Sequence, residues 1–205
     1  MTSLYTTLLT YGSFIQLNNK ISGPKFIDWT EDNFEYVRYN PRKPIERYGL
    51  SITSYDGGLS GIPDLDSLMD YNKENNTQLE EQNFDVTTPV YDNSSELQKF
   101  VSPYKDDLFR THILKLNPGG FFPRHRDYYR NGFRHVRLIA ALKNPCTFLL
   151  EDKVLNWEVG RLYFLDTAKE HTLFNATGSA SYWLVINYKL NEKTFNTIYD
   201  NFTYK

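Results

Sequence analysis

The fold is decided by residues 135–188, where short apolar segments alternate with turn residues. The segments are HVRLIAAL (135–142), CTFLL (146–150), VLNW (154–157), RLYFL (161–165), HTLF (171–174) and SYWLVINY (181–188). Proline, glycine or short polar runs separate them, and these residues favour turns. Short strands at this spacing predict an all-β sandwich or barrel.

The segment just upstream extends the same pattern. Residues 108–116 (LFRTHILKL) are predicted to form a strand, and residues 117–120 (NPGG) a turn, because proline fixes φ and glycine allows positive φ. The turn leads into FFPRHRD (121–127). Residues two apart in a strand point to the same face, so His125 and Asp127 can present an imidazole and a carboxylate side by side.

A second imidazole, His171, comes from a distant segment of the chain. Two histidines and one carboxylate on one side of a metal leave positions open opposite them, which is the arrangement of non-heme Fe(II) oxygenases. The alternatives are a surface His-x-Asp pair and a partly buried histidine bonded to the backbone. We therefore treat His125, Asp127 and His171 as candidate metal ligands.

Composition sets limits on the kind of protein. The 205 residues are 40% hydrophobic and 23% charged, which is typical of a folded globular chain. The net charge of −2 predicts no broad attraction to nucleic acid or to a membrane surface. No apolar run approaches the length of a membrane span, and residues 1–5 lack signal-peptide features. A single cysteine, Cys146, excludes an internal disulfide and favours a cytoplasmic location.

The chain is expected to form one compact domain. Residues 1–107 supply strands, helices and loops packed on a β-rich core at residues 108–190, and residues 191–205 form a tail. Within the first region, we predict strands or an extended arm at 5–16, a strand at 48–55 and short helices at 64–71 and 94–101. The tail is predicted to be a short helix or a strand.

Residues 116–187 resemble the aspartyl/asparaginyl β-hydroxylase-like and prolyl-hydroxylase-like branch of the Fe(II)- and 2-oxoglutarate-dependent dioxygenases. The shared features, in order, are NPGG (117–120), His125-x-Asp127, RLIAAL (137–142), WEVGRLYFLD (157–166) and His171-x-x-x-Asn175. The resemblance implies a mainly β protein: a double-stranded β-helix, jelly-roll or cupin-like, with a few flanking helices.

The resemblance also implies an activity. His125, Asp127 and His171 would bind Fe(II), and 2-oxoglutarate and O2 would be co-substrates in the hydroxylation of an unactivated C–H bond. The substrate would be an amino acid or a prolyl, aspartyl or asparaginyl residue of a peptide. Arg137 corresponds to a basic residue that holds a carboxylate of 2-oxoglutarate in this branch, and a guanidinium is the natural bidentate partner of a carboxylate.

One feature departs from the family pattern. Many members carry an arginine or lysine about ten residues after the distal histidine, whereas this chain has Ser181 and Tyr182 there. Binding of 2-oxoglutarate would then depend on Arg137, with a hydroxyl of Ser181 or Tyr182 assisting. The same departure keeps open a cupin-like metalloprotein of non-oxygenase type, such as an isomerase or hydrolase. A non-catalytic jelly-roll binding module is a third possibility.

The remaining candidates surround the proposed metal. Asp166 and Asn175 are expected not to contact the metal directly. A hydrogen bond from one of them is expected to orient His171. A basic and aromatic cluster could bind an acidic substrate or could be a solvated loop; it includes Arg124, Arg126, Tyr128 and Arg134.

Overall fold

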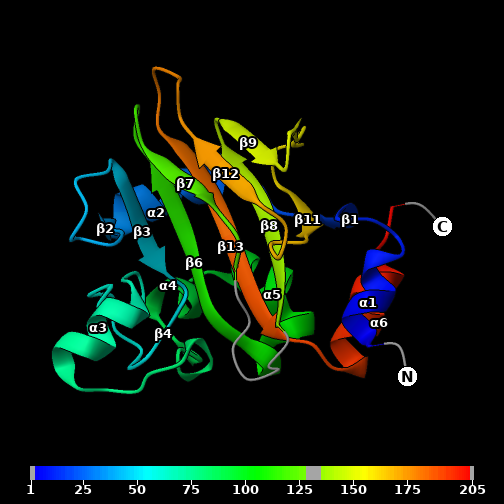
Figure 1. Cartoon of the computed structure of the whole chain (residues 1–205), viewed down its shortest axis with the longest axis horizontal. Helices are drawn as coiled ribbons and strands as arrows, with labels where there is room; N and C mark the ends of the chain where they lie inside the picture. The colour runs from blue at the N-terminus through cyan, green and yellow to red at the C-terminus, as the bar shows by residue number, and fades with distance from the viewer. Residues whose placement is uncertain (1–2, 128–134, 204–205) are drawn as a thin grey trace.

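Two antiparallel sheets face each other in the computed structural model, which describes residues 3–127 and 135–203 (Figure 1). The larger sheet has the strand order β1-β11-β8-β13-β6-β3-β2, and the smaller has the order β10-β9-β12-β7. The strands are β1 (Phe14–Lys20), β2 (Val37–Arg38), β3 (Arg47–Ser51), β6 (Leu108–Leu116), β7 (Phe121–His125), β8 (His135–Lys143), β9 (Thr147–Leu150), β10 (Lys153–Val154), β11 (Arg161–Leu165), β12 (His171–Phe174) and β13 (Ser181–Lys189). A separate short ladder joins β4 (Thr53–Ser54) to β5 (Val86–Thr87).

From β6 onward the chain passes back and forth between the two sheets. β6, β8, β11 and β13 lie in the larger sheet, and β7, β9 and β12 lie in the smaller one. This winding is a double-stranded β-helix, so the predicted mainly β, jelly-roll-like fold is confirmed. The strands predicted at residues 108–116 and within 135–188 form where the apolar segments and turns indicated, except that the segment predicted at 154–157 is a strand only at Val154.

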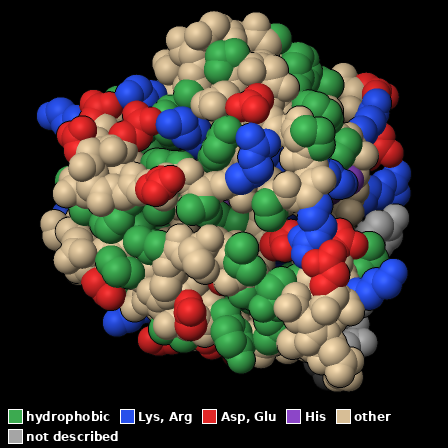
Figure 2. Space-filling model, turned by 90° about the vertical axis from the view of Figure 1, so that its left-hand side faces the viewer, with side chains coloured by type: hydrophobic (Ala, Val, Ile, Leu, Met, Phe, Trp, Pro, Cys, Tyr) green, Lys and Arg blue, Asp and Glu red, His purple; other side chains and the backbone are tan. Residues whose placement is uncertain are grey.

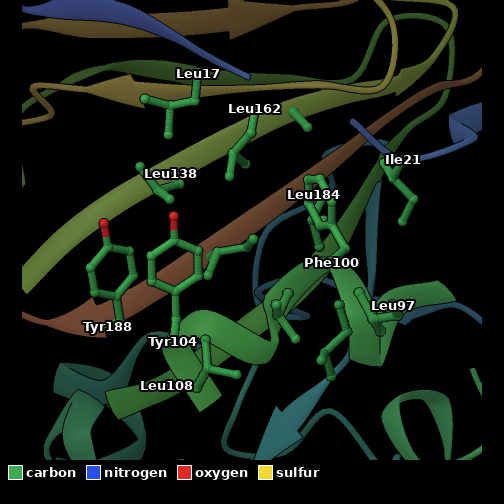
Figure 3. Packing of buried hydrophobic residues seen from close by; sticks show 14 of the residues in the cluster. Leu17, Ile21, Leu97, Phe100, Tyr104, Leu108, Leu138, Leu162, Leu184 and Tyr188 are labelled. Carbon is green, nitrogen blue, oxygen red and sulfur yellow. The ribbon is translucent and has the colours of Figure 1, made fainter. Parts of the chain in front are cut away.

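The strands at the centre of the larger sheet are apolar on both faces because both faces are covered. Leu138 of β8 and Leu184 of β13 point outward to the helices, whereas Ile139 and Trp183 point inward to the smaller sheet. Figure 3 shows the outer cluster, where Leu138, Leu162 and Leu184 of the sheet pack with side chains of the helical segment around Tyr104. Burial on two faces explains why these strands read as continuous apolar runs.

Helices cover the outer face and one end of the larger sheet. They are α1 (Leu4–Leu9), α2 (Gly23–Asn33), α3 (Leu68–Asn75), α4 (Pro89–Asp92), α5 (Ser95–Val101) and α6 (Glu192–Asp200), with 3-10 turns η1 (Glu81–Asn83) and η2 (Ser102–Asp107). α1 and α6, from opposite ends of the chain, lie side by side in Figure 1. The predicted helix at 94–101 is confirmed as α5, and the tail is helical.

Some expectations for the N-terminal region are wrong. Residues 4–9 are a helix rather than a strand or arm, because Ser3 caps it and the spacing of Tyr5 and Leu8 buries both on one side. The helix predicted at 64–71 is displaced, because Ser67 accepts from the backbone N–H of Asp70 and starts α3 at Leu68. α2 was not anticipated, although Pro24 in its first turn is a helix-start signal.

Residues 1–107 contribute β1 to one edge of the larger sheet and β3 and β2 to the other edge. They also supply most of the helices that share the outer apolar cluster with β8, β11 and β13. This shared packing supports the prediction that the chain forms one domain, with its regions at 1–107, 108–190 and 191–205. The division itself stays a prediction.

On the face toward α3, β2 and β3, acidic and basic side chains are interspersed rather than separated by sign (Figure 2). Across the described part of the chain, no helix combines the length and the apolar character needed to cross a membrane.

The turn before β11 depends on Gly160. Its φ is +77°, its N–H donates to Ala141 (2.7 Å), and its carbonyl accepts from Ile21 (2.9 Å). A side chain at this position would collide with the carbonyl oxygen of Ile21. We expect Gly160→Ala to lower the free energy of unfolding by about 2–4 kcal/mol, from backbone strain plus the clash. The matched control is Gly178→Ala, whose added Cβ meets nothing within 4 Å. Urea denaturation measures both, and equal stability of the two variants contradicts the interpretation.

Candidate metal centre and its cavity

Pairing of β7 with β12 brings the two candidate histidines together. His125 lies directly opposite His171 in the ladder, and their ring centres are 4.2 Å apart. Directly opposed residues of an antiparallel pair share one face of the sheet, so strand register alone makes the two imidazoles neighbours. His171 is buried, whereas His125 is partly exposed at the cavity wall.

Each imidazole is oriented by its own strand. Nδ1 of His125 lies 2.7 Å from the carbonyl oxygen of Pro123, and Nδ1 of His171 lies 3.0 Å from that of Lys169. A neutral imidazole that donates from Nδ1 to a carbonyl has its lone pair on Nε2. Both rings therefore present Nε2 as the free ligand atom.

Asp127 completes the group. Its backbone N–H donates to the carbonyl of Thr167 (2.9 Å), which fixes the chain just beyond the end of β7. One carboxylate oxygen lies 3.7 Å from Nε2 of His125. One possible ligand atom from each of His125, Asp127 and His171 lies within 4.8 Å of the other two. The structure thus brings the three sequence-predicted residues to one point.

The surroundings favour an ionised Asp127 carboxylate and a neutral His171 imidazole. Burial by itself would raise the pKa of Asp127, but the neighbouring Arg137 guanidinium and the two histidines outweigh it and hold that pKa below its ordinary value. Burial lowers the pKa of His171, against the opposing effect of Asp127. These are the protonation states that a divalent metal needs in its ligands.

Arg137 connects Asp127 to the larger sheet. Its Nη1 pairs with the Asp127 carboxylate, and its Nε donates to Oδ1 of Asn187 (2.8 Å). The amide nitrogen of Asn187 donates in turn to the carbonyl of Arg110 (2.8 Å). The position of the carboxylate is therefore set by a hydrogen-bonded series that crosses three adjacent strands.

The series ends at an irregularity in β6. Arg110 has a φ of +40°, and the register of β6 against β13 shifts between Val185 and Asn187. Bulges of this kind re-aim side chains and occur next to functional sites. Here the bulge turns the Arg110 carbonyl toward Asn187 and Nδ1 of His112 (3.1 Å). The Arg110 guanidinium pairs with Glu81.

The three residues open into a cavity of about 400 Å³ between the sheets, a size typical of small-ligand sites. Its inner part is apolar, lined by Leu114, Ile139, Phe148, Leu173, Trp183 and Val185. Its remaining wall carries the polar and charged side chains together with a few apolar ones, and much of that wall comes from residues 39–81. His112 also lines it; burial lowers the pKa of His112 to about 3, so this imidazole is neutral.

The predicted assistance from Ser181 and Tyr182 is wrong, because neither lines the cavity. Tyr182 points to the outer face, where it packs against Tyr36 and donates to Glu31. Ser181 accepts from the indole N–H of Trp183 (2.8 Å). It also lies six residues along β13 from Asn187, about 20 Å at strand rise.

The expectation that Asp166 and Asn175 orient His171 is wrong, because both side chains bond to other groups. Asp166 is buried and accepts from the hydroxyl of Tyr5 (2.6 Å), which ties α1 to the turn before β12. Asn175 donates to the carbonyls of Leu116 (2.9 Å) and Ser179 (2.8 Å), which ties the turn after β12 to β6. Both residues stabilise the loops at the two ends of β12.

The structure describes two of the basic residues proposed for substrate binding, and neither is on the cavity wall. Arg124 pairs with Asp152 and Glu170, and Arg126 is exposed; neither lines the cavity. Tyr128 and Arg134 lie outside the described residues.

Sequence reasoning missed Asn187, Arg110 and Arg47. Asn187 had a signal: it is the polar residue inside the apolar run SYWLVINY (181–188), and a buried amide requires partners. The positive φ of Arg110 and the burial of Arg47 have no local signature, because both arginines stand in segments of mixed polarity.

The fold and the site define a double-stranded β-helix protein with a two-histidine, one-carboxylate cluster at its cavity. The family model for aspartyl/asparaginyl beta-hydroxylase matches residues 67–189, more than half of the chain, and the chain belongs to this family of hydroxylases. No curated protein matches the sequence.

Two solved structures share the fold over most of the chain. A prolyl-4-hydroxylase from Pseudomonas putida is 15% identical with a TM-score of 0.51, over 90% of this chain and 96% of its own. A prolyl hydroxylase from Trichoplax adhaerens, in complex with a hypoxia inducible factor oxygen degradation domain peptide fragment, is 14% identical with a TM-score of 0.51, over 91% and 88%.

The role assigned to Asn187 can be tested by stability. Replacing it with leucine removes the acceptor of Arg137 and the donor to the Arg110 carbonyl, and leaves both groups buried without that partner. We expect Asn187→Leu to lower the free energy of unfolding by about 2–4 kcal/mol. The control is Asn93→Leu at an exposed position, which should change it by less than about 0.5 kcal/mol. Similar losses in both variants would contradict the role.

Proposed function

We propose that this protein is an Fe(II)- and 2-oxoglutarate-dependent dioxygenase that hydroxylates an unactivated C–H bond of an amino acid or a peptidyl residue. The observation that carries the proposal is the convergence of His125, Asp127 and His171 at the wall of a small-ligand cavity. Membership of a hydroxylase family supports the same class of reaction.

The residues fit a divalent iron site by their chemistry. Two imidazole nitrogens and one carboxylate oxygen come from one wall, and the cavity supplies room on the other side. This donor set is the one that non-heme Fe(II) oxygenases use. When bound there, the iron would supply activation of O2 coupled to the oxidative decarboxylation of 2-oxoglutarate to succinate and CO2.

The protein groups would hold and orient. The carbonyls of Pro123 and Lys169 keep Nε2 of each histidine aimed at the metal, and Arg137 keeps the Asp127 carboxylate in place. Because Arg137 touches a candidate ligand, its guanidinium lies beside the metal position. The guanidinium is therefore suited to bind a carboxylate of 2-oxoglutarate through charge-assisted hydrogen bonds.

The inner cavity would exclude water from the reacting atoms. Its lining is largely aliphatic and aromatic, and its histidine, His112, has a pKa of about 3 and carries no charge. A reactive oxidant needs such a dry cavity to avoid side reactions.

The substrate class rests on the comparisons and on surface charge. A structure of the same fold contains a bound peptide, which supports a peptidyl prolyl, aspartyl or asparaginyl substrate beside a free amino acid. The net charge of −2 and the interspersed charges on the face in Figure 2 support partners limited to this substrate and O2, without nucleic acid or membrane. The single cysteine, Cys146, supports a cytoplasmic location.

A cupin-like metalloprotein of non-oxygenase type is the second candidate. The observation that favours it is the position of Ser181 and Tyr182 where family members carry a basic residue. Zn(II) or Mn(II) would suit the same donor set. This candidate predicts metal binding without affinity for 2-oxoglutarate.

The test combines metal binding with turnover. We expect the protein to bind one Fe(II), or Co(II) as a spectroscopic substitute, and to release succinate from 2-oxoglutarate in its presence. His171→Ala and Asp127→Ala each remove one of three ligands and should lower metal affinity at least 100-fold. His112→Gln changes a cavity histidine outside the cluster and should retain the metal. Unchanged metal affinity in His171→Ala and Asp127→Ala would refute the site, and metal binding without 2-oxoglutarate binding would favour the second candidate.

A further inference from the structure

Arg47 is a buried cation on the cavity wall. It opens β3, which lies between β6 and the edge strand β2 of the larger sheet, and it is 3% exposed. Its guanidinium carbon lies 4.4 Å from the ring centre of Phe122 and 5.4 Å from that of Tyr39. Its Nη1 lies 3.5 Å from the carbonyl oxygen of Phe121, a long and weak hydrogen bond.

Every carboxylate on the cavity wall is already paired with a different arginine. Asp66 pairs with Arg42, Glu81 with Arg110, and Asp127 with Arg137. Within residues 3–127 and 135–203, Arg47 makes no ion pair, and its buried Nε has no hydrogen-bond partner. Stacking on aromatic rings compensates only part of the cost of burying a guanidinium, so the cavity lacks one negative charge at this position.

A second unsatisfied group lies nearby on the chain. Asn40 lines the same cavity and is 8% exposed, and its side-chain Oδ1 has no partner among the described residues. The backbone N–H of the preceding residue, Tyr39, donates to the carbonyl of Arg47 (3.0 Å), so the bend after β2 that carries Asn40 lies beside the start of β3. Rotation of the carboxamide by 180° exchanges the positions of its oxygen and nitrogen, so Asn40 can also donate an N–H group to an anion.

We propose that Arg47, assisted by Asn40, binds a carboxylate group of a ligand in the cavity. A guanidinium pairs with a carboxylate through two parallel, charge-assisted hydrogen bonds, and the pair gains strength where water is excluded. The subsite comes from residues outside the segment matched by the hydroxylase family, 67–189. It would supply from the N-terminal region the cation that positions 181 and 182 lack.

Distance is compatible with a dicarboxylate that spans the cavity. The Arg47 guanidinium carbon is 4.4 Å from the Phe122 ring centre, and that centre is 6.4 Å from the His125 ring centre. The guanidinium therefore lies within about 11 Å of the His125 imidazole. A five-carbon diacid extends about 5 Å between its end carbons, and the contacts at its two ends add several ångströms. The carboxylate can thus belong to 2-oxoglutarate, which rests on the proposed function, or to an acidic group of the substrate.

The first experiment separates these two sources. With the Zn(II)-loaded full chain, calorimetry compares 2-oxoglutarate with 2-oxovalerate, which lacks the far carboxylate. A second arm compares N-acetyl-aspartate amide with N-acetyl-asparagine amide on protein saturated with 2-oxoglutarate. We expect Arg47→Met to abolish the preference for the additional carboxylate in one arm. It should weaken the ligand that carries this carboxylate about 30- to 100-fold and leave unchanged the affinity for the partner ligand that lacks it. Arg47→Lys should retain part of the preference, because it keeps the charge and loses the fork.

The control is Arg38→Met, which removes a guanidinium from the neighbouring strand β2, stacked on Tyr48 and away from the cavity. The proposal is overturned if Arg47→Met leaves the carboxylate preference intact in both arms. It is also overturned if Arg38→Met reduces that preference as much as Arg47→Met does. The lack of any such preference in the unaltered protein overturns it as well. Glutarate against valerate on metal-free protein keeps the test independent of the metal, so failure of the iron assignment can be told apart from failure of this subsite.

Thermal unfolding provides a second readout. Without ligand, Arg47→Met should unfold at the same or a higher temperature than the unaltered protein, because an uncompensated buried charge is removed. A purely structural arginine would give the opposite result. A lower unfolding temperature together with unchanged ligand preference contradicts a binding role for Arg47.

Discussion

The candidate site depends on the register between β7 and β12. His125 and His171 are 46 positions apart in sequence and become neighbours only because these strands pair with the two residues opposite each other. A slip of one residue would turn one imidazole to the other face of the sheet. The register is held at both ends of β12 by buried side chains, Asp166 bonded to Tyr5 and Asn175 bonded to β6. These two residues therefore act on strand position and leave the imidazoles to the backbone.

The larger sheet contributes mainly to stability, and the smaller sheet supplies the two histidines of the candidate metal site. The central strands of the larger sheet are buried on both faces, and they carry the outer apolar cluster together with the helices. The smaller sheet contributes the two histidines, and Asp127 follows directly after β7. Arg137 and Asn187 link them: the rigid strands β8 and β13 hold the carboxylate of a residue that lies beyond the end of its own strand. A group on a loop thus acquires the positional precision of the sheet behind it.

The sequence predicted the parts of the fold that depend on local periodicity. The alternation of apolar segments and turns in 108–188 located nearly every strand. His125 and Asp127 both line the cavity, although β7 ends at His125 and the strand spacing that predicted their common face does not extend to Asp127. What failed depended on contacts between distant segments. Tyr182 faces outward because the last strand packs helices on that side, and no local pattern distinguishes its two covered faces. Arg47 is buried by Tyr39 and Phe122, which approach it only after β3 joins β6.

The hydrogen bonds of the two histidines have a wider meaning. Each ring is held by the carbonyl of the residue two positions earlier in the same segment, so the proton on Nδ1 is fixed by main-chain atoms that every amino acid possesses. Many metal sites instead rely on a carboxylate side chain for this purpose. Here no neighbouring side chain is needed for this hydrogen bond. The residues packed around the imidazoles can therefore be substituted, and the pocket adapted to other substrates, without changing the orientation of the ligand atoms.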